Sequence, residues 1–156
     1  TLGRICDSLK LHRGRMLAQS FLVSADNAHA VHPNHPEYAD PGNAPVMGGG
    51  LVIKYNANLS YCTDSVSAGV FRKICGRAGV RVQTYHNRAD LPGGSTLGRI
   101  SLAHVSVPTV DIGLAQLAMH SCYETAAVSD AIDLENAMAA YYGATLEATQ
   151  TGFVIR

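Results

Sequence analysis

Short apolar runs alternate with longer amphipathic segments along this sequence, and this alternation restricts the fold more than any other feature. The apolar runs predict strands over residues 20–26, 51–55, 80–86 and 109–112. The amphipathic segments predict helices over residues 1–19, 64–78, 97–103 and 129–142. Strands and helices that alternate in this way are typical of an α/β layered fold. We therefore expect one sheet with helices on both of its faces.

The segment from residue 27 to residue 50 interrupts this alternation. It contains four prolines and several glycines, and its apolar residues show no periodicity, so we expect a long loop. Loops of this length in compact domains are usually functional. Ligands of open α/β sheets bind at the carboxyl ends of the strands, which here carry Asp26, Asn56, Asn58 and residues 87–90 and 113–120.

Charge is scarce and balanced. The 156 residues include 12 Lys and Arg and 12 Asp and Glu, so 15% of the side chains are charged and the formal net charge is zero. Ordinary domains carry about 25% charged residues. No basic cluster is available for a nucleic acid or for an anionic membrane surface. The shortage of charge and the start at Thr1 favour a surface that partly contacts other protein.

The remaining composition indicates an intracellular protein. No apolar stretch is long enough to cross a bilayer, and no signal-peptide pattern opens the sequence. The four cysteines form no CxxC pair and no dense framework, so we expect reduced thiols in the cytoplasm. No GxSxG motif and no Cys–His spacing indicates a covalent nucleophile.

Potential metal ligands follow the first predicted strand. Asp26, His29, His32 and His35 place one carboxylate and three imidazoles within ten positions. Zinc and similar cations favour this mixture of oxygen and nitrogen ligands. Each residue also has a structural interpretation, because Asp26 could cap a turn and the histidines could lie in a polar loop. Their combination favours a site.

Three further features have both a functional and a structural interpretation. His120 follows the last predicted strand and could lie near Asp26, or it could be a buried histidine bonded to a carbonyl. Lys54 lies in an apolar strand, where it needs a partner or ligand unless it reaches solvent from an edge. Residues 93–96 could bind an anion at a helix N-terminus, although an ordinary N-cap explains them better.

Five blocks together resemble a known family, the aspartyl aminopeptidases (aminopeptidase I) with a dinuclear zinc site. The blocks occur in the family order and with similar spacing: Ser20–Asn34, Val52–Lys54 with Tyr61, Gly94–Gly98, Thr109–Gly113 and Gln116–Ser121. The resemblance implies a three-layer α/β sandwich of the zinc-exopeptidase type, with a mixed and mostly parallel sheet.

The resemblance also implies roles for individual residues. Asp26 would be a ligand of one zinc ion and His120 a ligand of the other. His29, Lys54 and Tyr61 would contact the substrate, with Lys54 pairing with the acidic side chain of an N-terminal Asp or Glu. The family takes its general-base glutamate and three further metal ligands from an upstream segment. The sequence has no Glu-Glu pair, so we expect no catalytic base here.

These implications lead to two hypotheses. The first is that residues 1–156 are the C-terminal portion of the catalytic domain of a cytoplasmic zinc aminopeptidase. The upstream part and an inserted dimerisation domain would then lie outside this chain. Its partners would be a peptide substrate, the remainder of the catalytic domain and further copies in a dimer-based assembly, such as a dodecamer. The second is a non-catalytic scaffold or shell subunit that keeps the peptidase fold.

Overall fold

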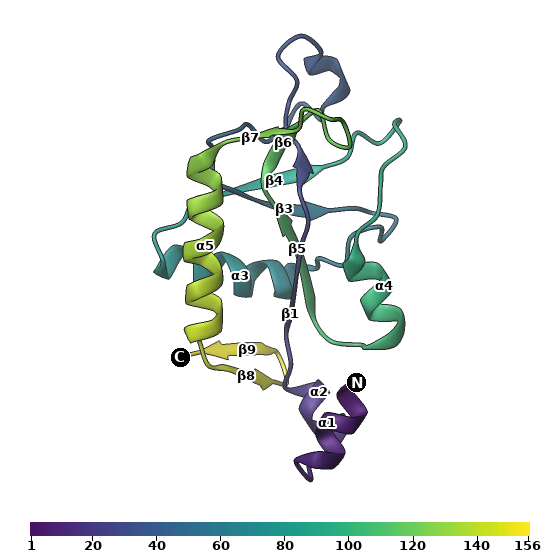
Figure 1. Cartoon of the computed structure of the whole chain (residues 1–156), viewed down its shortest axis with the longest axis vertical. Coiled ribbons are helices and arrows are strands. Elements are labelled where there is room, and N and C mark those ends of the chain that lie inside the picture. The colour runs from purple at the N-terminus through teal and green to yellow at the C-terminus, as the bar shows by residue number, and fades with distance from the viewer.

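A computed structural model describes residues 1–156 and contains five α-helices, one 3₁₀-helix and nine strands (Figure 1). The helices are α1 (Leu2–Ser8), α2 (Arg13–Ala18), the 3₁₀-helix Pro36–Tyr38, α3 (Ser65–Arg77), α4 (Leu97–His104) and α5 (Val128–Gly143). The strands are β1 (Leu22–Ala25), β2 (Ala28–His29), β3 (Leu51–Tyr55), β4 (Val82–His86), β5 (Thr109–Gly113), β6 (Ala115–Leu117), β7 (Thr125–Ala126), β8 (Leu146–Thr149) and β9 (Gly152–Ile155). None of the helices has the length and apolar character that a membrane span requires.

The main sheet has four strands in the order β1-β5-β3-β4. β1 is parallel to β5 and β3 is parallel to β4, whereas β3 and β5 are antiparallel. The sheet is therefore mixed and mostly parallel, as the family resemblance implied. Two small sheets, β2-β6-β7 and β8-β9, complete the strand pairing.

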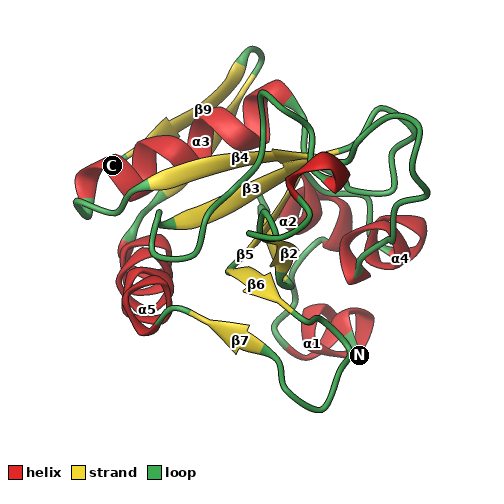
Figure 2. Ribbon diagram, turned by 90° about the horizontal axis from the view of Figure 1, so that it is seen from above, coloured by secondary structure: helices red, strands yellow, loops and turns green.

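Helices cover both faces of the main sheet (Figure 2). α3 and α5 pack together on one face, which we call the core face, and α4 contacts β1 and β5 on the other, which we call the site face. The expected layered α/β architecture is confirmed. α1 and α2 lie at the opposite end of the molecule from β6 and β7 (Figure 1).

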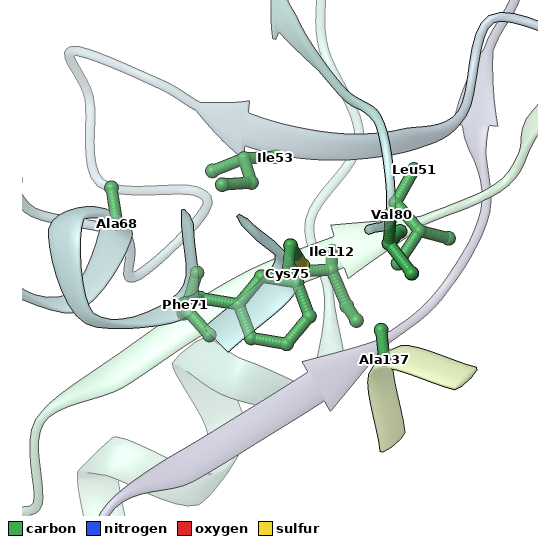
Figure 3. Packing of buried hydrophobic residues seen from close by; sticks show 9 residues of the cluster. Leu51, Ile53, Ala68, Phe71, Cys75, Val80, Ile112 and Ala137 are labelled. Atoms are coloured by element: carbon green, nitrogen blue, oxygen red, sulfur yellow. The ribbon is translucent and has the colours of Figure 1, made fainter. Parts of the chain in front are cut away.

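The hydrophobic core lies between the sheet and α3 and α5. β3 alternates, because Leu51 and Ile53 belong to this core while Lys54 points to the site face, as the twofold period of a strand requires. Phe71 of α3 is fully buried against these strand residues, close to Ile112 of β5 (Figure 3). A fully buried aromatic side chain of this size makes a large contribution to stability.

Local signals explain the boundaries of α3. The Asp64 carboxylate accepts a hydrogen bond from the Ser67 N–H at 2.7 Å, and the Ser67 hydroxyl accepts one from the Asp64 N–H, which forms a capping box. Gly79, with φ of +69°, follows the C-cap and ends the helix. The structure thus places this helix within the predicted range of residues 64–78.

Other segments differ from the prediction. The expected helix over residues 1–19 is divided in two, and the break lies at Leu9–His12, where Lys10 adopts a left-handed conformation with φ of 53°. The loop over residues 27–50 includes the short strand β2 and the 3₁₀-helix. Strands β6 to β9, of two to four residues each, were not predicted.

Candidate metal and substrate site

Asp26 lies directly after β1, at the carboxyl end of that strand. Its backbone N–H donates to the carbonyl of Ile112 in β5 at 2.9 Å, and its side chain is exposed. The backbone is therefore fixed by the sheet while the carboxylate faces outward. A carboxylate that is held in this way fits the role of a ligand to a divalent cation.

Gly113, the last residue of β5, allows β5 to approach Asp26 closely. A Cβ atom at position 113 would overlap with the carbonyl group of Asp26 and lie 2.8 Å from the Cα atom of Asn27. No residue larger than glycine can therefore occupy this position unless the Asp26 segment moves. The close approach explains a glycine at the end of an otherwise buried strand.

Lys54 is buried, with only 1% of its surface exposed. Its ammonium group donates to the carbonyl oxygens of Asp26 at 2.7 Å and Asn27 at 3.2 Å. Burial lowers the pKa of Lys54, while the nearby charges of Asp26 and Asp111 act in the opposite direction. Lys54 therefore stabilises the backbone that carries Asp26. It does not reach solvent from an edge strand, because β3 lies inside the sheet.

Tyr61 lies over the Lys54 side chain. The Lys54 ammonium is 5.0 Å from the centre of the Tyr61 ring, within the range of a cation–π interaction. Burial, with a further contribution from Tyr85, raises the pKa of Tyr61 to about 12. The phenol is therefore neutral at physiological pH and can act as a hydrogen-bond donor.

His29 in β2 is an imidazole with a lowered pKa, although its side chain remains exposed. Burial lowers its pKa, and the neighbouring His120 and Lys54 lower it further by charge repulsion. β2 pairs with β6 in parallel, with His29 opposite Gln116. The charges of His120 and Lys54 thus act on His29, and a common site of these residues remains a prediction.

The segment that carries His120 has an unusual backbone. Ala118 and His120 have positive φ angles of 53° and 66°, which are uncommon for residues other than glycine. The carboxylate of Glu124 accepts a hydrogen bond from the His120 N–H at 2.6 Å. Conformations of this kind persist when surrounding contacts hold them, and they are common at functional sites. The side chain of His120 is exposed and can bind a ligand.

Two amide side chains connect the strands beside these residues. The Asn27 amide donates to the Gln116 side-chain oxygen, and the Asn27 side-chain oxygen accepts from the Leu114 N–H at 3.2 Å. The Gln116 amide nitrogen is buried without a hydrogen-bond partner. Sequence reasoning did not assign roles to Asn27, Gln116 or Glu124. The contact of Glu124 with His120 depends on the turn between them and leaves no signal in the sequence.

A cavity of about 450 Å³ opens next to His29. The residues around it include His29, His32, His35, His86, Gln116 and Gly93. His32 and His35 are exposed, with their rings 5.4 Å apart, and His35 contacts Glu37 at 3.0 Å. These two histidines therefore form part of a polar loop beside the cavity, which was the structural interpretation of their sequence pattern.

The side chains of Asp26 and His120 fit part of a metal site. Asp26 and His120 provide a carboxylate oxygen and an imidazole nitrogen, which are common zinc ligands. No group of three or more His, Cys, Asp or Glu side chains in the chain is arranged to hold a metal ion. A zinc ion bound by these residues would need further ligands, because three or four protein ligands are usual.

The turn at residues 93–96 is not an ordinary N-cap. Thr96 occupies the N-cap position of α4, but its side chain makes no capping hydrogen bond. Its hydroxyl donates instead to the Asp111 carboxylate at 2.6 Å. The N-cap interpretation is therefore wrong for the Thr96 side chain, because a buried carboxylate on β5 uses the hydroxyl.

A mixed α/β sheet with a carboxylate and imidazoles at its edge is suited to a metal-dependent hydrolase. The sequence model of the family described as aminopeptidase I zinc metalloprotease (M18) matches residues 2–143. The chain belongs to this M18 aminopeptidase family. The resemblance inferred from the five sequence blocks is confirmed.

Individual relatives agree with this membership. The chain is 46% identical over 132 residues to the probable M18 family aminopeptidase 2 of Mycobacterium leprae, a match that covers 85% of this chain and 31% of that protein. It also resembles the solved structure of Ape4 in complex with Nbr1, with a TM-score of 0.79 and 36% identity, over 90% of this chain and 28% of that one. The chain spans about a third of the length of the curated relatives it matches.

A more distant structure shows the same fold. The Saccharomyces cerevisiae mApe1 dodecamer aligns with a TM-score of 0.68 and 23% identity, over 91% of this chain and 35% of that one. At this identity the similarity concerns the fold alone.

Proposed function

We propose that residues 1–156 form the C-terminal portion of the catalytic domain of a metal-dependent aminopeptidase. The complete enzyme would remove N-terminal residues from peptides, with a preference for Asp and Glu. The main support is that Lys54 binds the Asp26 backbone and that the charges of Lys54 and His120 act on His29, in a chain that belongs to the M18 family. The short span relative to the family members supports the partial-domain assignment.

In this proposal Asp26 binds one divalent cation and His120 binds a second, most simply zinc, because zinc is the metal in the family description. When bound, two such cations polarise the scissile carbonyl and lower the pKa of a water molecule. The chain itself holds the Asp26 backbone through Lys54 and the His120 backbone through Glu124. The further ligands and the general-base glutamate would come from the remainder of the catalytic domain.

Lys54 has a defined way to contribute to acidic specificity. An ammonium group has three donors, and two of them are used by the carbonyl oxygens of Asp26 and Asn27. The third donor makes no hydrogen bond within the chain, and in this proposal it binds the carboxylate of an N-terminal Asp or Glu. His29 would then contact the same substrate residue from β2. The Tyr61 hydroxyl would contact it from the segment that lies over Lys54.

The proposal also includes an assembly and a location. An oligomer built from dimers, such as a dodecamer, is supported by the exposed apolar side chains on α4 and α5, among them Leu97, Ile100, Ile132 and Tyr142. A cytoplasmic location is supported by four free cysteines.

The first experiment measures bound metal and activity in the complete enzyme. We expect about two zinc ions per subunit, and we expect His120→Ala to lose one of them together with most of kcat. Gln150→Ala, on the exposed turn between β8 and β9, is the control and should leave both unchanged. Retention of both ions in His120→Ala would contradict the ligand assignment. A complete enzyme without metal or activity would favour the scaffold hypothesis.

A second experiment tests the specificity assigned to Lys54. We expect Lys54→Met to raise KM for a substrate with N-terminal Asp by at least about tenfold, and KM for one with N-terminal Leu much less. Equal losses on the two substrates would show that Lys54 acts only through the Asp26 backbone.

A further inference from the structure

A row of polar side chains crosses the site face of the sheet. Ser24 of β1 is paired with Asp111 of β5, and Lys54 of β3 is paired with Tyr85 of β4. Because Ile53 is opposite Ile112 in the antiparallel pair, the next position places Lys54 beside Asp111. Asp111 therefore lies in the sheet next to the lysine that supports the Asp26 backbone.

Asp111 is fully buried, and both of its carboxylate oxygens are in use. One oxygen accepts a hydrogen bond from the Thr96 hydroxyl at 2.6 Å, and the other accepts from the Cys62 N–H at 2.5 Å. A buried carboxylate is costly unless it is hydrogen-bonded, so these two donors are needed for its stability. With both oxygens engaged in the interior, Asp111 is not positioned as a ligand for an external cation.

The contact with the Cys62 N–H fixes the segment that carries Tyr61. Besides the Cys62 N–H, the Thr63 hydroxyl also binds Asp111, because it accepts from the Asp111 backbone N–H at 2.8 Å. The residues that follow Tyr61 are thus attached to β5 at two points. This attachment holds the Tyr61 ring over the Lys54 ammonium, at the observed 5.0 Å.

The contact with the Thr96 hydroxyl fixes the first turn of α4. A Cβ atom at Gly98 would lie 2.7 Å from one Asp111 oxygen and 2.9 Å from the other. The glycine at position 98 and the threonine at position 96 therefore both fit the Asp111 carboxylate. Part of the Gly94–Gly98 block, which sequence analysis could interpret only as an anion site or a cap, is explained by this internal contact.

We propose that Asp111 is a positioning residue for the substrate pocket, because it holds the Tyr61–Thr63 segment beside Lys54 and the first turn of α4 against β5. It acts through Tyr61 and Lys54 and does not touch the substrate. The inference rests on the proposed function for the roles of Tyr61 and Lys54, whereas the attachment of the segment to Asp111 is independent of that function.

Asp130 offers a matched control. It is also fully buried, and its carboxylate accepts hydrogen bonds from the Gly48 N–H at 2.8 Å and the Gly50 N–H at 3.0 Å. Asp130 belongs to α5, on the core face. Asp111→Asn and Asp130→Asn therefore make the same chemical change, in which one acceptor oxygen becomes an amide, at two buried sites that differ in their distance from Lys54.

The test compares the two variants in the complete enzyme. We expect both to lower the urea midpoint. Only Asp111→Asn should raise KM for the Asp substrate, by about tenfold, with a smaller change in kcat, as expected when a hydrogen bond to a charged group is lost. It should also accelerate alkylation of Cys62, measured by peptide mass spectrometry against the exposed Cys122 as internal reference.

A second pair of variants covers the case in which Asp111→Asn does not fold. Thr96→Val removes the hydroxyl with little change of shape, and Thr96→Ser retains it. We expect Thr96→Val to raise KM for the Asp substrate and the rate of Cys62 alkylation, as Asp111→Asn does. Thr96→Ser should keep both at the wild-type values.

The outcomes separate this inference from the proposed function. If Cys62 alkylation and KM in Asp111→Asn match those of Asp130→Asn, the positioning role is overturned. If alkylation rises while KM is unchanged, Asp111 holds the segment, but the substrate roles proposed for Tyr61 and Lys54 are wrong. If both rise only in Asp111→Asn, the positioning role is supported.

Discussion

The two faces of the main sheet are built by the same strands but are filled in different ways. On the core face, Leu51, Ile53 and Ile112 pack against α3 and α5, and their contacts are apolar. On the site face, Lys54 and Asp111 are equally buried, but they are held by hydrogen bonds to other segments. Apolar packing tolerates small shifts, whereas hydrogen bonds fix atoms within a few tenths of an ångström. The core face therefore determines stability and the site face determines geometry.

The largest effect that follows from this comparison concerns stability and the core face. Phe71→Ala should lower the free energy of unfolding by about 3–5 kcal/mol, because it removes a fully buried aromatic ring and leaves a cavity. Leu97→Ala on α4, where the side chain is 68% exposed, should change it by no more than about 0.5 kcal/mol. Urea unfolding monitored by circular dichroism gives both values. A loss below about 1 kcal/mol in Phe71→Ala would contradict the assignment of the core.

The next largest effect concerns two glycines, Gly113 at the end of β5 and Gly69 in α3 on the core face. Gly113→Ala should displace Asp26 and lower the free energy of unfolding by about 1–3 kcal/mol, since the added methyl group overlaps with the Asp26 carbonyl. In the complete enzyme, zinc affinity measured by chelator competition should fall by at least about tenfold.

Gly69→Ala is the matched control for this change. Gly69 lies on the exposed side of α3, with open space where a Cβ atom would be placed, so alanine should raise stability by about 0.5–1 kcal/mol. Unchanged zinc affinity in Gly113→Ala would show that the close approach of β5 does not position Asp26.

The same difference between the faces explains what the sequence could predict. Residues 51–55 were predicted as a strand and form β3, and residues 64–78 were predicted as a helix and contain α3. These elements have strong local signals, namely an uninterrupted apolar run and a helical period that starts at an N-cap and stops at a glycine. Core packing depends on such local periodicity, so it can be inferred from residues that are close in sequence.

The site face depends on contacts between distant residues. Lys54 was expected to need a partner, but the carbonyl of Asp26, 28 positions earlier, could not be identified from the pattern. The interaction between Thr96 and Asp111 joins residues 15 positions apart and replaces the expected cap. The family resemblance provided the roles of Asp26, His29, Tyr61 and His120, which remain predictions. It did not indicate which groups hold these residues in place.

The smallest effect concerns a buried thiol on the core face. Burial raises the pKa of Cys75 to about 11 from an ordinary value of 9.0. The native state therefore favours the neutral thiol over the thiolate. The stability that this preference contributes is fully present below pH 9 and is lost as the pH rises toward 11. Between about pH 8.5 and pH 10.5, the free energy of unfolding of the wild type should fall by on the order of 1 kcal/mol more than that of Cys75→Ala. Urea unfolding at the two pH values measures both.

Alkylation by iodoacetamide at pH 8 tests the same burial without unfolding the protein. The thiolate is the reactive species, so Cys75 should react far more slowly than the exposed Cys122. Cys62, on the site face, has a pKa that burial also raises, but its side chain is only half-buried, and it should react at an intermediate rate. If Cys75 reacted as fast as Cys62, the core face would open as readily as the site face. The distinction between a packed face that sets stability and a hydrogen-bonded face that sets geometry would then be wrong.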